Sequence, residues 1–254
     1  MSAETLLFGG AAEAYARYRP GYPQALFDLL LARTAGRGVA LDLGSGTGAM
    51  LGPLTDRFER VAAVEPDAKM AALIAPAPNL DVQVASAETA PLPGKVDLVT
   101  CGTAFHWFDG PRVLSRLAEV AVPGALLAVC TYYRPDPGPA TKAVIEDEIK
   151  ARWKPFMHDR LGRHDYAART LDAHGDWTAP ERVRVPHRFE MAAEDLAGFH
   201  ASTSYGSAYL RTLADPQGYL TDFADRLAEA NGSRMLTVSL PVETLLSQPA
   251  GRRS

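Results

Sequence analysis

The sequence has few cysteines, no dense cluster of positive charge and no long apolar run. Its 254 residues include only two cysteines, Cys101 and Cys130, each at the end of an apolar stretch. Two cysteines exclude a scaffold built on disulfides and are typical of a reducing compartment. No apolar run approaches the roughly 18 residues of a membrane span, and no basic region precedes an apolar stretch at the N-terminus. We therefore expect a cytoplasmic protein with no membrane partner.

Charge and histidine placement exclude two further classes. The formal net charge is −4 at pH 7, whereas binding to a nucleic-acid backbone requires clustered lysine and arginine. His158, His164 and His174 alternate with aspartates, but no pair has the i, i+4 spacing of a helical zinc motif. We therefore expect neither a nucleic-acid partner nor a metal. The remaining composition, 47% hydrophobic and 22% charged, is that of a globular protein.

A glycine-rich loop is the most informative local pattern in the sequence. The apolar run Val39–Leu41 is typical of a buried parallel strand, and residues 49–54 favour a helix. Between them, Gly44-Ser45-Gly46-Thr47-Gly48 places three glycines at alternate positions. Glycines there permit a tight turn and let a ligand approach the backbone, with the N–H groups of the helix start nearby. A plain strand-to-helix turn is the alternative.

An acidic residue follows at an informative distance. Residues 60–64 predict a second strand, which ends in Glu65, 21 positions after Gly44. Nucleoside-binding folds place a carboxylate near this spacing, where it accepts hydrogen bonds from a ribose diol. Charge-assisted hydrogen bonds of this kind are stronger than neutral ones. By itself Glu65 is equally well read as a surface acid, but together with the loop it predicts a nucleoside site.

The loop spacing narrows the choice of nucleoside. It is G-x-G-x-G rather than the G-x-G-x-x-G of dinucleotide sites, and without lysine or arginine it is no triphosphate cradle. At this point the chain resembles the class I S-adenosylmethionine-dependent methyltransferases, most closely the small-molecule type 11 branch. The resemblance covers about residues 8–133 and rests on Arg17–Pro23, Leu41–Gly48, Val64–Asp67 with Met70, Ala85–Glu88 with Pro91–Pro93, Val96–Val99 and Ala104–Phe108.

The resemblance implies an α/β fold. It has a doubly wound, Rossmann-like, mostly parallel sheet of seven strands with one antiparallel strand, an N-terminal lid and inserted helices near the C-terminal half. We expect one methyltransferase domain over residues 1–254. Within it, residues 1–35 would form the lid helices, 36–135 the cofactor-binding core, and 136–254 the substrate-side helices and last strands.

The spacing of apolar residues predicts further elements. Helices are expected at 4–18, 23–34, 111–121, 140–153, 193–202 and 216–230, and strands at 80–85, 96–101, 125–130, 183–191 and 235–242. In the resembled fold the last of these strands would run antiparallel beside the fifth. Pro135, Pro137 and Pro139 interrupt the chain and mark the best candidate boundary.

The resemblance also implies a cofactor and its contacts. S-adenosyl-L-methionine would be consumed and S-adenosyl-L-homocysteine released. The cofactor-binding positions carried over are Gly44, Ser45, Gly46, Gly48, Glu65, Pro66, Met70, Ser86, Ala87, Glu88, Gly102, Thr103 and Arg19. Met70 would pack on the adenine ring or simply fill the core. Ser86 departs from the aspartate frequent in the wider family, so backbone atoms of Ala87, or Glu88, would read the base edge.

An aromatic and cationic cluster precedes the core. Tyr15, Tyr18, Arg19 and Tyr22 would form either a packed N-terminal cap or a lid. In the lid interpretation, Arg19 pairs with the methionine carboxylate of the cofactor and a tyrosine hydroxyl contacts the substrate.

The substrate side is expected near the end of the fourth strand. His106 is the histidine beside the predicted site and accepts a proton near neutral pH, so it is the first candidate base, with Tyr15 second. A structural histidine beside Trp107 is the alternative. The predicted substrate-binding residues are Tyr18, Trp107, Phe108, Tyr132, Tyr133 and Tyr205, and their aromatic character favours a flat or apolar small molecule.

The sequence therefore predicts methyl transfer to an O, N or C acceptor on a small molecule. Two alternatives stay open. One is a nicotinamide-dependent oxidoreductase on a similar scaffold, against which the loop spacing speaks. The other is a protein that binds the same cofactor without methylating, or a cyclase, since only the acceptor side would differ.

Overall fold

The computed structural model describes residues 12–158 and 165–251. The chain divides into two compact units. The unit we call the sheet unit comprises residues 21–132, 160–185 and 242–254, and the unit we call the helical unit comprises residues 1–20, 133–159 and 186–241. The chain passes from one to the other at Tyr133, two residues before the predicted break at Pro135. The prediction of one domain over the whole chain stays a prediction.

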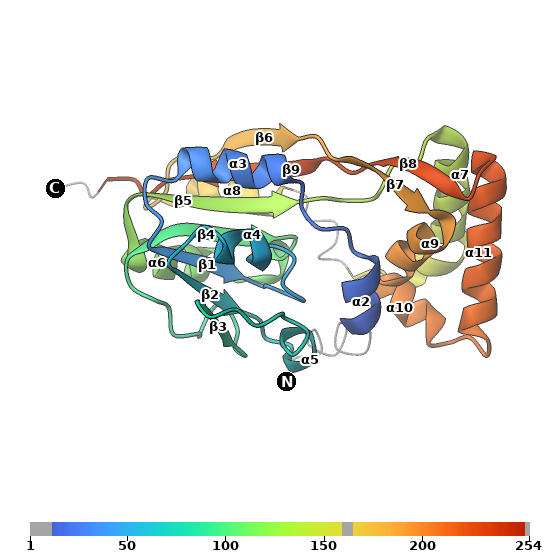
Figure 1. Ribbon diagram of the computed structural model, residues 1–254, viewed down its shortest axis with the longest axis horizontal. Coiled ribbons are helices and arrows are strands. Elements are labelled where there is room, and N and C mark those ends of the chain that lie inside the picture. The colour runs from blue at the N-terminus through green and yellow to red at the C-terminus, as the bar shows by residue number, and fades with distance from the viewer. Residues whose placement is uncertain (1–11, 159–164, 252–254) are drawn as a thin grey trace. The chain divides into compact units, whose positions relative to one another are not determined.

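The sheet unit is built on a sheet of seven strands (Figure 1). In spatial order these are β3 (Leu80–Gln83), β2 (Arg60–Val64), β1 (Val39–Leu43), β4 (Val96–Gly102), β5 (Ala121–Thr131), β9 (Val242–Ser247) and β6 (Glu181–Val185). Strands β3, β2, β1, β4 and β5 are parallel, and β9 runs antiparallel to both its neighbours. The predicted doubly wound, mostly parallel sheet with one antiparallel strand is confirmed.

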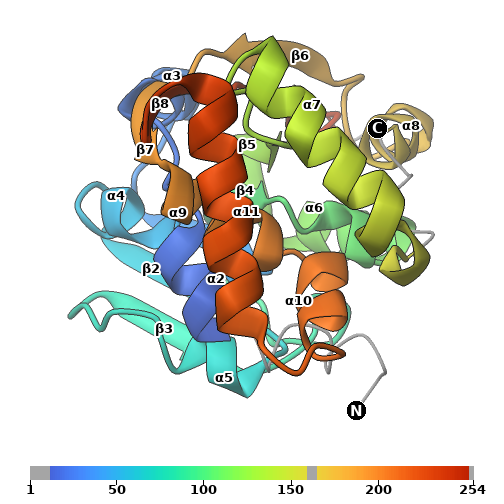
Figure 2. The same ribbon diagram turned by 90° about the vertical axis from the view of Figure 1, so that its right-hand side faces the viewer.

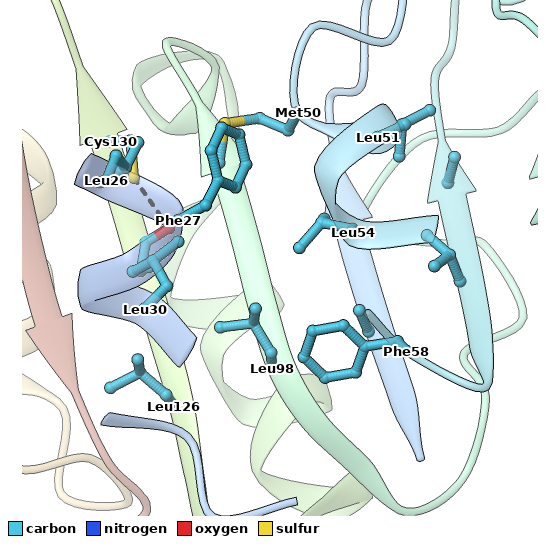
Figure 3. Close-up of a cluster of buried hydrophobic side chains, with 14 of the residues drawn as sticks. Leu26, Phe27, Leu30, Met50, Leu51, Leu54, Phe58, Leu98, Leu126 and Cys130 are labelled. Carbon is cyan, nitrogen blue, oxygen red and sulfur yellow. Dashed lines mark hydrogen bonds between the residues drawn. The ribbon is translucent and has the colours of Figure 1, made fainter. Parts of the chain in front are cut away.

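Helices cover both faces of this sheet, because its strands are apolar on both sides. On one face α3 (Gln24–Arg33) and α4 (Leu51–Thr55) contribute Leu26, Phe27, Leu30 and Leu54 to a buried cluster (Figure 3). On the other face lie η1 (Phe105–Trp107), α6 (Gly110–Val120) and α8 (Tyr166–Ala173). Successive residues of one strand alternate between the two clusters, as the pleat of a strand requires; on β5, Leu126 joins the first and Leu127 the second.

The helical unit consists of five α-helices, two shorter helices and one strand pair within the described residues (Figure 2). The helices are α2 (Ala12–Tyr18), α7 (Pro139–Glu148), η2 (Ile149–Trp153), η3 (Lys154–Phe156), α9 (Ala193–Ala201), α10 (Ser204–Leu210) and α11 (Pro216–Asn231). Helix α11 packs against α7 and α9. It begins at the cap Asp215, whose side chain accepts from Gly218 N, and ends at Gly232 with a positive φ of 72°.

The strand pair corrects two predictions. Residues 183–191 were expected to form one strand, and residues 235–242 another, the last of the main sheet. Instead β7 (Arg188–Ala192) and β8 (Met235–Ser239) pair with each other in a separate two-stranded sheet. The strand antiparallel to β5 is β9, which begins only at Val242. Pro186 and Pro241 separate the halves, because proline has no N–H to continue a ladder.

Most other predicted elements are present. Helices lie within two residues of the predictions at 23–34, 111–121, 193–202 and 216–230. Residues 140–153 are helical, as α7 followed by the π-helix η2. The helix predicted at 4–18 is described only as α2, since its first residues lie outside the described part. Helices α8 and α10 were not predicted. No helix in residues 12–158 and 165–251 has the length and apolar character to cross a membrane.

Candidate functional site

Three predicted site segments meet at the carboxyl edge of the parallel strands. The glycine loop leaves β1, Glu65 follows β2, and Thr103 follows β4. Strand β1 lies between β2 and β4 in the sheet. The segments are therefore neighbours, at the edge where open α/β sheets bind their ligands.

The loop conformation depends on its glycines. Gly44, Gly46 and Gly48 have positive φ angles of 67°, 57° and 91°, which side-chain-bearing residues rarely adopt. The N–H groups of Gly44 and Ser45 both donate to Val64 O, at 2.8 and 3.2 Å, and tie the loop to the end of β2. A Cβ on Gly44 would lie 2.5 Å from Ala104 Cβ.

The Glu65 carboxylate lies beside this loop and is 6% exposed. Its Oε2 accepts from Gly46 N at 2.8 Å and its Oε1 accepts from Asp67 N at 2.9 Å. Burial raises the pKa of the Glu65 carboxyl, and the two backbone N–H groups act in the opposite direction. A carboxylate has about four lone-pair sites, so each oxygen keeps capacity for a hydroxyl. The Glu65 carboxylate can therefore accept hydrogen bonds from the two hydroxyl groups of a vicinal diol.

A short helix follows Glu65. The Asp67 side chain accepts from Lys69 N and Met70 N and begins α5 (Ala68–Ala71). The Met70 side chain is 5% exposed, whereas Pro66 is exposed. Burial of the thioether is compatible with a core residue and with one wall of a pocket for the adenine base. Both interpretations of Met70 therefore stay predictions.

The turn after β3 is held by an arginine from α6. The Arg116 guanidinium donates to Ala87 O at 2.5 Å and also to Ala90 O. Glu88 Oε1 accepts from Asp109 N at 2.9 Å, and Ser86 Oγ bonds Thr89 Oγ1 at 2.9 Å. The side chains of Ser86 and Glu88 thus already have protein partners.

The end of β4 is a strained position. Thr103 is β-branched and has a φ of 55°, which indicates a conformation held by its surroundings. Its N–H donates to Cys130 O at 2.7 Å, and its hydroxyl bonds Tyr22 Oη at 3.1 Å. A Cβ on Gly102 would lie 2.7 Å from the same Tyr22 Oη. Tyr22 in turn packs on the buried Tyr132, with ring centroids 5.4 Å apart.

The candidate base lies in the short helix η1. The His106 ring is half-buried, 4.9 Å from the Trp107 ring. Phe108, also half-buried, packs edge-on to Phe105 at 5.8 Å. Tyr166 of α8 fixes the residues that follow, because its hydroxyl donates to Phe108 O at 3.1 Å and accepts from Gly110 N at 3.0 Å.

A buried acid lies on β1 just before the glycine loop. Asp42 on β1 is 1% exposed, and its Oδ1 accepts from Thr100 Oγ1 on β4 at 2.6 Å. Burial raises the pKa of Asp42 to about 7. The Ser45 hydroxyl donates to Asp42 O at 3.0 Å.

Several predicted site residues belong to the helical unit: Tyr15, Tyr18, Arg19, Tyr133 and Tyr205. Arg19 lies over the rings of Phe199 at 4.3 Å and Tyr15 at 4.9 Å, and its Nε donates to Ser202 Oγ at 3.2 Å. Tyr18 packs against α9 at Gly198. Their predicted roles as lid, cofactor ligand and substrate contacts stay predictions.

Sequence reasoning gave no role to three residues of the sheet unit: Asp42, Arg116 and Tyr166. Asp42 was visible as a polar residue inside an apolar strand. Arg116 and Tyr166 reach loops distant in sequence, which no local pattern shows. Among the described residues, no group of three or more histidine, cysteine or acidic side chains is arranged to hold a metal ion.

Known proteins share this architecture. A family model described as a methyltransferase domain matches residues 41–129. Uncharacterised methyltransferases of Mycobacterium tuberculosis and Mycobacterium bovis are 39% identical over 96% of this chain and 97% of their own length. A solved structure from Anaeromyxobacter dehalogenans, assigned as a type II methyltransferase, is 30% identical, with a TM-score of 0.74 over 91% of this chain and 98% of that one.

The relatives match along almost the whole chain, and the sheet order and loop agree with their class. The chain belongs to the class I S-adenosylmethionine-dependent methyltransferases.

Proposed function

We propose that the protein transfers a methyl group from S-adenosylmethionine to an O, N or C atom of a small molecule, with Glu65 as the central cofactor contact. The observation that carries the proposal is the Glu65 carboxylate, which is bound to Gly46 N at 2.8 Å and retains lone pairs. Glu65 would accept hydrogen bonds from the ribose hydroxyls. The backbone of Gly44, Ser45, Gly46 and Gly48 would lie against the amino-acid part.

The other cofactor contacts follow from the same edge of the sheet. Met70 would pack on the adenine ring, and backbone atoms of the turn at Ala87 would read the base edge. Gly102 and Thr103 would face the sulfur end. Arg116 and Tyr22 would act as positioning residues, since they hold the turn and Thr103 respectively.

The sulfonium methyl group of the cofactor is already electrophilic, so the protein mainly has to align the acceptor and exclude water. A base is needed only where the acceptor atom carries a proton at neutral pH. His106 is the candidate in the sheet unit, because an imidazole takes up a proton near pH 7. Trp107 and Phe108 beside it would contact a flat or apolar substrate.

The function is tested by measuring methyl transfer from labelled S-adenosylmethionine to a panel of small molecules. The panel contains three classes of acceptor, with an O, an N or a C atom as the nucleophile. Label should move into at least one class with wild-type protein. His106→Ala should reduce turnover about 100-fold or more if His106 is the base. His174→Ala, which changes a histidine elsewhere in the sheet unit, is the matched control. No transfer to any class by a protein that binds the cofactor would contradict the proposal.

A further inference from the structure

The helical unit contains a buried histidine without a hydrogen-bond partner. His200 lies on α9 and is 0% exposed, and neither Nδ1 nor Nε2 is bonded to any described residue. Buried polar groups are nearly always paired in native proteins, because leaving one unpaired destabilises the fold. An imidazole kept in this state therefore calls for a functional explanation.

Two arginines, Arg19 and Arg134, carry positive charges that act on His200. Arg19 packs over Phe199, the neighbour of His200 in sequence, and donates to Ser202 two residues further on. Arg134 is exposed. In the described part of the chain, neither forms an ion pair with a carboxylate, unlike Arg152, Arg226 and Arg234 of the same unit.

The electrostatic effect on His200 agrees with this arrangement. Burial, then the charges of Arg134 and Arg19, lower the pKa of His200 to about 3. The imidazole is thus neutral at physiological pH, with one nitrogen that donates and one that accepts. The two charges that act on His200 are both positive and belong to the guanidinium groups of Arg134 and Arg19.

Aromatic side chains pack close to His200 and are held in place by hydrogen bonds. Trp153 is 0% exposed, and its ring lies 6.2 Å from His200 and 6.1 Å from Tyr205. Its indole N–H donates to Tyr219 Oη at 2.9 Å, and Tyr219 donates to the buried Glu148 at 2.5 Å. Two arginines complete this network on Glu148. The rings therefore form a rigid apolar environment packed around His200.

We propose that Arg19, Arg134 and His200 bind the carboxylate group of a small organic acid. The guanidinium groups would offset the charge, and guanidinium–carboxylate hydrogen bonds are the stronger, charge-assisted kind. The neutral His200 would donate a hydrogen bond to a carboxylate oxygen.

Binding of the acid is testable without methyl transfer. Benzoate and benzamide share one shape and differ in charge, so they are titrated calorimetrically into the full-length protein. Benzoate should bind at least about 10-fold more tightly than benzamide. Arg134→Gln should weaken benzoate binding about 10-fold, whereas Arg188→Gln, an exposed arginine on β7 of the same unit, should leave it unchanged.

His200→Phe separates the binding role from a structural one. Phenylalanine fills a similar volume and removes the unpaired polar group, so the melting temperature should hold or rise while benzoate binding falls about 10-fold. If that variant does not fold, the Arg134→Gln and Arg188→Gln pair decides. Equal binding of benzoate and benzamide, or equal losses in the two arginine variants, would overturn the inference. Inorganic phosphate binding in place of benzoate would also overturn it.

S-adenosylhomocysteine is titrated into the same samples. Absence of benzoate binding by wild-type protein that binds the cofactor counts against this inference alone. Absence of cofactor binding counts against the proposed function.

Discussion

Asp42 makes folding sensitive to pH. Its pKa rises from an ordinary 3.8 to about 7 in the folded state because the carboxyl is buried. The folded protein therefore keeps a proton that the unfolded chain releases, and stability decreases as pH rises through this window. We predict a fall of about 2–3 kcal/mol between pH 5 and 8 from this group.

Asp42→Asn tests this prediction. Asparagine still accepts from Thr100 Oγ1 but does not titrate, so urea midpoints of the variant should vary less with pH than those of the wild type. Parallel pH profiles for the two proteins would assign the titration to another group.

Gly44 is required by the loop conformation. Its φ is 67°, and a Cβ would lie 2.5 Å from Ala104 Cβ. Gly44→Ala should therefore destabilise the fold by at least about 2 kcal/mol, measured by urea unfolding. Gly52→Ala is the matched control, because Gly52 lies in α4 with open space around it. That variant should be neutral or stabilised by up to about 1 kcal/mol. Similar losses in both variants would contradict this account of Gly44.

At the scale of elements, helix α6 supports the turn that is proposed to read the adenine. Arg116 is its link to that turn, through the carbonyls of Ala87 and Ala90. Arg116→Met keeps the apolar stem of the side chain and removes both hydrogen bonds. We predict that S-adenosylhomocysteine binding weakens about 10-fold, since two charge-assisted hydrogen bonds to the turn are lost.

Arg112→Met, on the exposed part of α6, is the control for this prediction. It should bind the cofactor as the wild type does. If the two variants bind equally well, Arg116 does not position the turn.

Some helices and strands could be predicted from local sequence patterns and others could not. The strands β1, β2 and β4 were predictable because short apolar runs end in a glycine loop, an acid and a second glycine. Residues 183–191 and 235–242 were each predicted as one strand, because their apolar spacing continues across Pro186 and Pro241. The partners of each half come from distant segments, so the spacing alone did not indicate two sheets.

At the scale of the whole molecule, the parallel part of the sheet and most helices were predictable, whereas the way the segments of the helical unit pair with one another was not. The core of the sheet unit follows a local order of strand and helix from residue 21 to residue 132. The helical unit joins three separate segments, and its buried groups are paired across them. Tyr219 of α11 reaches Glu148 of α7, and Asp136 pairs with Ser239. Such long-range pairings leave no periodic signal in the sequence.

The same limit applies to the candidate site. Glu65 and the glycine loop were found because their residue types and spacing carry the chemistry. Arg116, Tyr166 and the unpaired His200 act through positions that only the folded chain brings together. Their residue types are common on ordinary helices.

The central claim is that Glu65 and the glycine loop bind the adenosine part of the cofactor. Calorimetric titration of S-adenosylhomocysteine into wild type, Glu65→Gln and Glu59→Gln tests it most directly, because Glu59 is an exposed acid just before β2. We predict binding by wild type and Glu59→Gln, and at least about 10-fold weaker binding by Glu65→Gln. Unchanged affinity in Glu65→Gln, or no heat with folded wild-type protein, would contradict the account.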